Sequence, residues 1–217
     1  MTKIKICGIS NLSDARFCVR CGADFLGFVF YKKSPRFVSP QKARKIIKKI
    51  KQKVIKVGVF VNEKPQTVKK IARLCGLDFL QLHGDESEAY VRKLRGFGII
   101  KAFRIKERLD TKLLESYPEA LFLFDSFKKN IFGGTGQVFD WALLEALSKT
   151  KKPFIVSGGL TPDNVRGLLE RIRPFAVDVS SGVEKAPGKK DLKLVKKFIE
   201  RVKKYNSRHT NKKNKQR

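Results

Sequence analysis

Residues 153–182 read PFIVSGGLTPDNVRGLLERIRPFAVDVSSG, and this stretch contains one complete unit of the fold. An apolar run at 153–156 is followed by a glycine pair and then by Thr161-Pro162, where a capping residue precedes a proline as at many helix starts. Amphipathic sequence continues to about Ile172, and a second apolar run follows at 175–179. Short, continuously apolar runs suit strands that are buried on both faces. The stretch therefore predicts two parallel strands joined by a helix.

The same alternation fills the chain from residue 3 to residue 205. The other predicted strands cover residues 3–7, 24–30, 54–61, 79–82, 98–103 and 120–124. The other predicted helices cover residues 10–19, 64–74, 86–94, 111–116, 139–147 and 191–205, and one more begins at Ser39-Pro40. Eight strand–helix units without a break predict an α/β fold, a single parallel eight-stranded (β/α)8 TIM barrel over residues 1–205. An open doubly wound sheet is the alternative, which the even rhythm disfavours.

Composition supports one globular domain and excludes several other classes. The chain has 217 residues, of which 41% are hydrophobic, enough for one sizeable core. No apolar run approaches the roughly 20 residues that span a bilayer, and the N-terminal residues lack the apolar segment of a secretory signal. We therefore expect a cytoplasmic protein without a membrane partner. Cys18 and Cys21 lack a second ligand pair, so we interpret them as helix residues and expect no metal site.

The charge is unusually basic for an enzyme that acts on small molecules. There are 49 Lys and Arg residues against 20 Asp and Glu, a formal net charge of +29. Residues 206–217 are rich in basic residues and poor in apolar ones, which predicts a disordered basic C-terminal tail. Without a zinc-finger or RNA-recognition motif, a nucleic-acid-binding protein is the less favoured reading. Weak, non-specific nucleic-acid binding is expected at most, and both a monomer and a homodimer are compatible with the sequence.

Functional-looking residues lie at the strand ends, where a barrel places its active site. Cys7 ends the first predicted strand, and Asp125 directly follows the sixth. A substrate between two such groups can receive a proton from one and lose a proton to the other. Arg36 follows the second strand, His83 the fourth, and Asp178 belongs to the eighth.

Glycine-rich loops at the same end predict a phosphate site. Gly158 and Gly159 follow the seventh strand, and Ser180-Ser181-Gly182 follows the eighth. Barrels often bind phosphate with these two loops and a helix N-terminus, because backbone N–H groups there face the anion. Gly134, in the cluster GGTG at 133–136 after the sixth strand, is a further candidate in a possible lid. The expected partner is thus a small phosphorylated molecule.

Taken together, these motifs resemble the phosphoribosylanthranilate isomerase family of tryptophan biosynthesis. They occur in order from near the N-terminus to about Asp191, and only the basic tail falls outside. They are KICG (5–8), GFVF (27–30), SPR (34–36), VGVFVN (57–62), QLHG (81–84), FDS (124–126), GGTG (133–136), SGGL (157–160) and VDVSSGVE (177–184).

The resemblance implies an Amadori rearrangement of N-(5-phosphoribosyl)anthranilate to 1-(2-carboxyphenylamino)-1-deoxyribulose 5-phosphate. It implies that Asp125 is the general acid at the furanose ring oxygen and that Cys7 is the general base at C2. It further implies that Arg36 pairs with the anthranilate carboxylate and that Asp178 holds the anthranilate side of the substrate, with His83 nearby. Neither a metal nor a cofactor is implied.

The ionisation of the two groups and a related function lead to two further expectations. An ordinary Asp is almost fully ionised and an ordinary Cys mostly protonated near pH 7, so we expect burial to raise the pKa of Asp125 and backbone dipoles to lower that of Cys7. The alternative function is a related phosphate-binding barrel, an isomerase, aldolase or lyase, for which Lys101 in the fifth strand would be the Schiff-base candidate.

Overall fold

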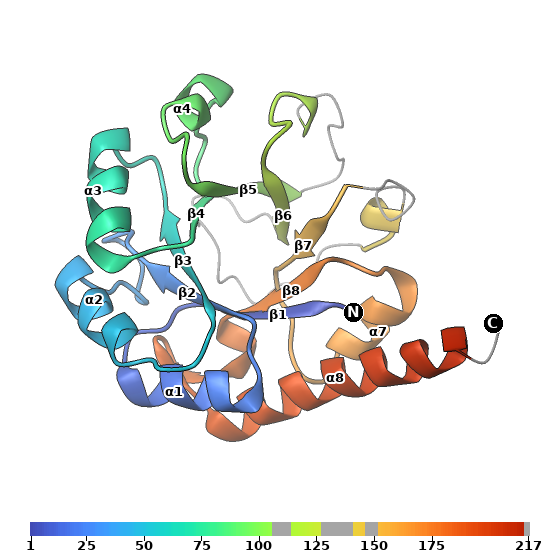
Figure 1. Cartoon of the computed structure of the whole chain (residues 1–217). Coiled ribbons are helices and arrows are strands. Elements are labelled where there is room, and N and C mark those ends of the chain that lie inside the picture. The colour runs from blue at the N-terminus through green and yellow to red at the C-terminus, as the bar shows by residue number, and fades with distance from the viewer. Residues whose placement is uncertain (106–113, 127–140, 146–151, 215–217) are drawn as a thin grey trace.

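Eight parallel strands close into a barrel in the computed structural model, as the alternating sequence predicted (Figure 1). The structure describes residues 1–105, 114–126, 141–145 and 152–214. Each strand pairs with its neighbour in the sequence, and β8 closes the ring by pairing with β1. The strands are β1 (Lys3–Ile6), β2 (Phe25–Val29), β3 (Ile55–Phe60), β4 (Phe79–Leu82), β5 (Gly98–Ile105), β6 (Leu121–Ser126), β7 (Phe154–Val156) and β8 (Ala176–Val179).

Helices surround this ring and follow the strands in sequence (Figure 1). Helix α2 begins as predicted, because the Ser39 side chain accepts a hydrogen bond from the Lys42 N–H and Pro40 occupies the first turn. Thr161 instead accepts from the N–H groups of Asp163 and Asn164 in a turn, and the following helix begins only at Val165. The described helices are α1 (Leu12–Cys21), α2 (Pro40–Lys48), α3 (Pro65–Cys75), α4 (Glu88–Arg92), η1 (Trp141–Leu144), α7 (Val165–Arg171), η2 (Ser181–Val183) and α8 (Leu192–Asn214).

The structure contains one pair of strands that the sequence did not predict. After η2 the chain forms an antiparallel hairpin, β9 (Glu184–Ala186) and β10 (Lys189–Lys190), that we did not predict. Its two strands are too short to produce a periodic pattern. The predicted helices at 111–116 and 139–147 lie partly outside the described residues, and η1 is the short 3-10 turn within the second of them.

The C-terminal helix does not end at residue 205, where we placed the end of the domain. Helix α8 continues to Asn214, so residues 206–214 belong to this helix. The Asn206 side chain accepts from the Thr2 N–H at 3.0 Å and donates to the Thr2 carbonyl at 2.9 Å. These bonds tie the helix to the start of β1. No described helix is both long and apolar enough to cross a membrane.

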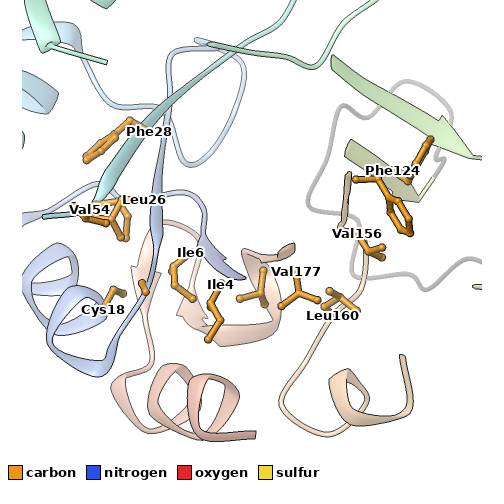
Figure 2. Close-up of a cluster of buried hydrophobic side chains, with 14 of the residues drawn as sticks. Ile4, Ile6, Cys18, Leu26, Phe28, Val54, Phe124, Val156, Leu160 and Val177 are labelled. Atoms are coloured by element: carbon orange, nitrogen blue, oxygen red, sulfur yellow. The ribbon is translucent and has the colours of Figure 1, made fainter. Parts of the chain in front are cut away.

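Two hydrophobic layers hold the barrel together. Ile4, Ile6 and Val177 belong to the larger cluster, which fills the space between the strands and the helices (Figure 2). Cys18 of α1 is fully buried in this layer, as its interpretation as a helix residue requires. Because side chains alternate along a strand, the intervening residues face inward. Those of the smaller cluster fill the barrel interior: Phe25, Val57, Ile100, Ala102, Leu123, Ile155 and Ala176.

Candidate active site

Toward the C-terminal ends of the strands, the side chains that line the barrel interior change from apolar to polar. Leu123 and Ala176 lie in the interior cluster. Two residues further along the same strands, and therefore on the same face, are Asp125 and Asp178, both buried. The change from apolar to polar along one face places titratable groups where water is largely excluded.

Asp125 is the centre of a buried hydrogen-bonded chain. The Gln81 Nε2 atom lies 2.8 Å from Nδ1 of His83, and Nε2 of His83 lies 3.0 Å from Oδ2 of Asp125. An amide nitrogen can only donate, so with this amide orientation Nδ1 accepts and Nε2 carries the proton toward Asp125. The Ser126 N–H donates to the other carboxylate oxygen at 2.9 Å. Asp125 thus faces two hydrogen-bond donors.

Cys7 follows β1, with its N–H donating to Val179 of β8 at 2.9 Å. Gly27 of β2 makes room for the thiol, because a Cβ there would lie only 2.7 Å from Sγ of Cys7. Burial raises the pKa of the Cys7 thiol, and the ammonium of Lys5 opposes this rise without cancelling it. The expectation that local dipoles lower this pKa is therefore wrong, because desolvation of the thiolate outweighs them.

Beneath Cys7 lies an ion pair that we did not predict. Nζ of Lys5 is 2.7 Å from Oδ2 of Asp178, and both side chains are almost completely buried. The second carboxylate oxygen of Asp178 has no hydrogen-bond partner among the described residues. Burial raises the pKa of Asp178, and Lys5 opposes that rise. The position of Lys5 two residues before Cys7, on the same face of the strand, is the signal that would have revealed it.

Arg36 lies in the loop after β2 and is already engaged by a carboxylate. Its Nε and Nη2 atoms donate to the two oxygens of Glu184 at 2.7–3.1 Å. Nζ of Lys190 lies 2.8 Å from the same carboxylate. Glu184 and Lys190 come from the hairpin absent from our prediction, so the sequence offered no signal that would pair them with Arg36.

The two predicted phosphate loops touch each other. Gly158 and Gly159 adopt left-handed backbone conformations, with φ of 82° and 63°. Gly182, inside the short helix η2, packs so closely on the other loop that a Cβ there would lie 1.9 Å from the Leu160 carbonyl oxygen. Ser180 and Ser181 therefore lie beside the loop after β7. The further candidate, Gly134, lies outside the described residues.

Lys101, the Schiff-base candidate of the alternative reading, is occupied elsewhere. Its Nζ lies 2.8 Å from Oε2 of Glu86 and donates to the Gly84 carbonyl at 2.7 Å. It also alternates along β5 with Ile100 and Ala102, which line the interior, and so lies on the other face of the strand. This buried pair fastens the loop after β4 and has no place among the interior groups.

The closed barrel and the titratable groups at its C-terminal end define a (β/α)8-barrel enzyme. Its family follows from comparison with known proteins. The family model described as "N-(5'phosphoribosyl)anthranilate (PRA) isomerase" matches residues 4–201. The chain belongs to this family and is an isomerase of tryptophan biosynthesis.

Relatives and solved structures agree over nearly the whole chain. An N-(5'-phosphoribosyl)anthranilate isomerase from Rubrobacter xylanophilus is 47% identical, covering 94% of this chain and 100% of its own. A crystal structure of monomers of the dimeric phosphoribosylanthranilate isomerase from Thermotoga maritima is 42% identical with a TM-score of 0.84, covering 94% of this chain and 99% of that chain. A further structure, in complex with reduced 1-(o-carboxyphenylamino)-1-deoxyribulose 5-phosphate, is also 42% identical, with a TM-score of 0.82 and the same coverage.

Proposed function

We propose that this chain converts N-(5-phosphoribosyl)anthranilate to 1-(2-carboxyphenylamino)-1-deoxyribulose 5-phosphate with Asp125 as general acid and Cys7 as general base. The observation that carries the proposal is the placement of a buried carboxyl and a buried thiol on the inward faces of the barrel wall at its C-terminal end. The family membership and the analogue bound to a related isomerase support the choice of substrate.

The first step opens the sugar ring. Asp125 donates its proton to the furanose ring oxygen, the C1–O bond breaks, and the anthranilate nitrogen shares its electron pair with C1 as a Schiff base. The carboxylate that remains accepts hydrogen bonds from Nε2–H of His83 and from the Ser126 N–H. Charge-assisted hydrogen bonds of this kind stabilise the carboxylate formed when the proton leaves. His83 thus acts on the substrate through Asp125.

The second step moves a proton from carbon. The Cys7 thiolate removes the proton from C2, and the C–H electron pair flows toward the Schiff-base nitrogen to give an enolamine. Tautomerisation of the enolamine to the ketone completes the isomerisation with no change in overall oxidation state. Because burial raises the pKa of Cys7, the thiolate is scarce but strongly basic when it forms.

Substrate binding follows from the groups around these two. Glu184 occupies the Nε–Nη2 edge of Arg36, so the anthranilate carboxylate is left to Nη1. The oxygen of Asp178 that has no partner in the described part of the chain is an acceptor for the anthranilate N–H. The 5-phosphate is bound by the touching loops that contain Gly158-Gly159 and Ser180-Ser181-Gly182, because backbone N–H groups of such glycine-rich loops bind anions.

The test is turnover of enzymatically generated phosphoribosylanthranilate, followed by loss of its fluorescence. We expect Cys7→Ala and Asp125→Asn each to lose about 10²–10⁴-fold in kcat, as positioned acid–base groups do. Cys21→Ala, at the end of α1 and away from the site, is the matched control and should stay active. A folded wild-type chain without turnover would refute the substrate, and near-wild-type kcat in either variant would refute that residue's role.

A further inference from the structure

Lys5 occupies a position where a strand inside a barrel would normally carry an apolar side chain. It lies on β1 between the outward-facing Ile4 and Ile6, and its own exposure is 0%. In the strand register it stands directly opposite Asp178 of β8, at the seam that closes the barrel. Its ammonium reaches that carboxylate at 2.7 Å, and Cys7 lies two residues further along the same inward face of β1.

A buried ion pair in this place needs a reason other than stability. Removing an ammonium and a carboxylate from water is costly, so such a pair is often no more stable than apolar residues of equal volume. The neighbouring side chain distinguishes Lys5 from two other buried lysines. Lys101 and Lys190 each join a carboxylate to a backbone carbonyl oxygen. Lys5 pairs with a carboxylate, and the next side chain on its face of the strand is Cys7, a thiol that must ionise.

We infer that Lys5 is a positioning residue for catalysis: its ammonium holds the Cys7 thiolate in place at the bottom of the site, and Asp178 holds that ammonium in place. The inference rests on the proposed role of Cys7 as the base. Lys5 keeps its proton throughout and touches no reacting atom.

The charges around Cys7 explain why the thiol, Lys5 and Asp178 are all needed. The charged groups that act on its thiol are Lys5 from β1, Asp178 from β8 and Lys190 from β10. Burial disfavours the thiolate, the two cations favour it, and the carboxylate disfavours it. When Cys7 accepts the C2 proton its charge disappears, and Asp178 then remains as the counter-ion of the buried ammonium. The cation is therefore paired before and after the proton transfer.

Removing each charge should shift the pKa of the Cys7 thiol in a different direction. Lys5→Met removes the favourable cation, so we expect about tenfold less thiolate at a given pH, or a pKa about one unit higher. Asp178→Asn removes the unfavourable anion and frees the ammonium for the thiolate, so the pKa of Cys7 should fall. Lys5→Arg keeps the charge and should restore most of the thiolate lost in Lys5→Met.

The measurement is the ultraviolet absorbance of the thiolate as a function of pH. Each variant is compared with the same protein carrying Cys7→Ala, so that the difference reports Cys7 alone and requires no turnover. The pH dependence of kcat/KM is recorded in parallel, and its rising limb should move with the titration. Loss of packing alone would not produce shifts of opposite sign in Lys5→Met and Asp178→Asn.

The outcomes separate this inference from the proposed function. An unchanged Cys7 titration in Lys5→Met, or a pKa of Cys7 that rises in Asp178→Asn, overturns the inference. If Lys5→Met fails to fold, the sign in Asp178→Asn decides. Titrations that shift as expected while the rising limb stays fixed support the hold of Lys5 on the thiolate and refute Cys7 as the base.

Discussion

A single added methyl group at Gly158 should separate the stability of the barrel from its catalysis. Gly158 has a φ of +82°, which disfavours any side chain. A Cβ there would lie 2.5 Å from the Ser126 backbone nitrogen and 2.8 Å from Oδ1 of Asp125. That nitrogen donates to the same carboxylate oxygen at 2.9 Å. The substitution Gly158→Ala therefore presses on the proposed acid and on the group that holds it.

The structure provides the magnitudes. The Cβ and the Ser126 nitrogen must separate by about 0.9 Å to reach 3.4 Å, the near limit of ordinary contact. A misplacement of about 1 Å can cost about 10²-fold in rate, and we expect that loss in kcat. The left-handed backbone adds about 1–2 kcal/mol of destabilisation once a Cβ is present.

The matched control is Gly76→Ala at the end of α3. Gly76 also has a positive φ, of 65°, but a Cβ there would meet nothing within 4 Å. The Gly76→Ala variant should lose about as much free energy of unfolding in urea as Gly158→Ala, and it should keep the wild-type kcat in the fluorescence assay. Wild-type kcat in Gly158→Ala would refute the displacement of Asp125, and a rise in KM alone would locate the disturbance at the phosphate loop instead.

Three other changes test the groups around the site and the core. Glu184→Gln should weaken the hold on Arg36 and raise KM about tenfold with little change in kcat. The reason is that Arg36 binds the anthranilate carboxylate of the substrate alike in the ground and transition states. A fall in kcat alone in steady-state kinetics would contradict this. Lys101→Met should leave Glu86 buried without its cation and lower the free energy of unfolding by about 3–5 kcal/mol in urea; no measurable loss would show that the pair does not fasten the loop. Burial raises the pKa of Cys18 from 9.0 to about 12. The unfolded chain thus ionises first, so the stability that Cys18 contributes is complete below pH 9.0 and is lost as the pH rises toward about 12. The free energy of unfolding of Cys18→Ala should therefore fall less steeply with pH than that of wild type over this range. Equal slopes would refute the burial of the Cys18 thiol as the cause.

Much of the candidate site was predictable because a barrel converts sequence order into place. In a barrel of eight such units the C-terminal ends of all the strands lie at one rim, so Cys7, Asp125 and Asp178 were expected together. The loops after β7 and β8 were expected to meet for the same reason. Strand and helix periodicities carry this information locally, in windows of a few residues.

The partners of these residues were beyond local patterns. Arg36 and Glu184 are 148 residues apart in the chain, and Lys5 and Asp178 are 173 apart. Such pairs depend on strand register and on the closure of β8 against β1, which no periodicity encodes.

The sequence by itself determined the barrel, the rim that holds the chemistry and the family. Only the tertiary structure decided which charges are paired and how far the last helix runs. It also reversed the direction expected for the pKa of Cys7. The physical reason is that desolvation and ion pairing depend on everything packed around a group, whereas a sequence pattern reports only its neighbours along the chain.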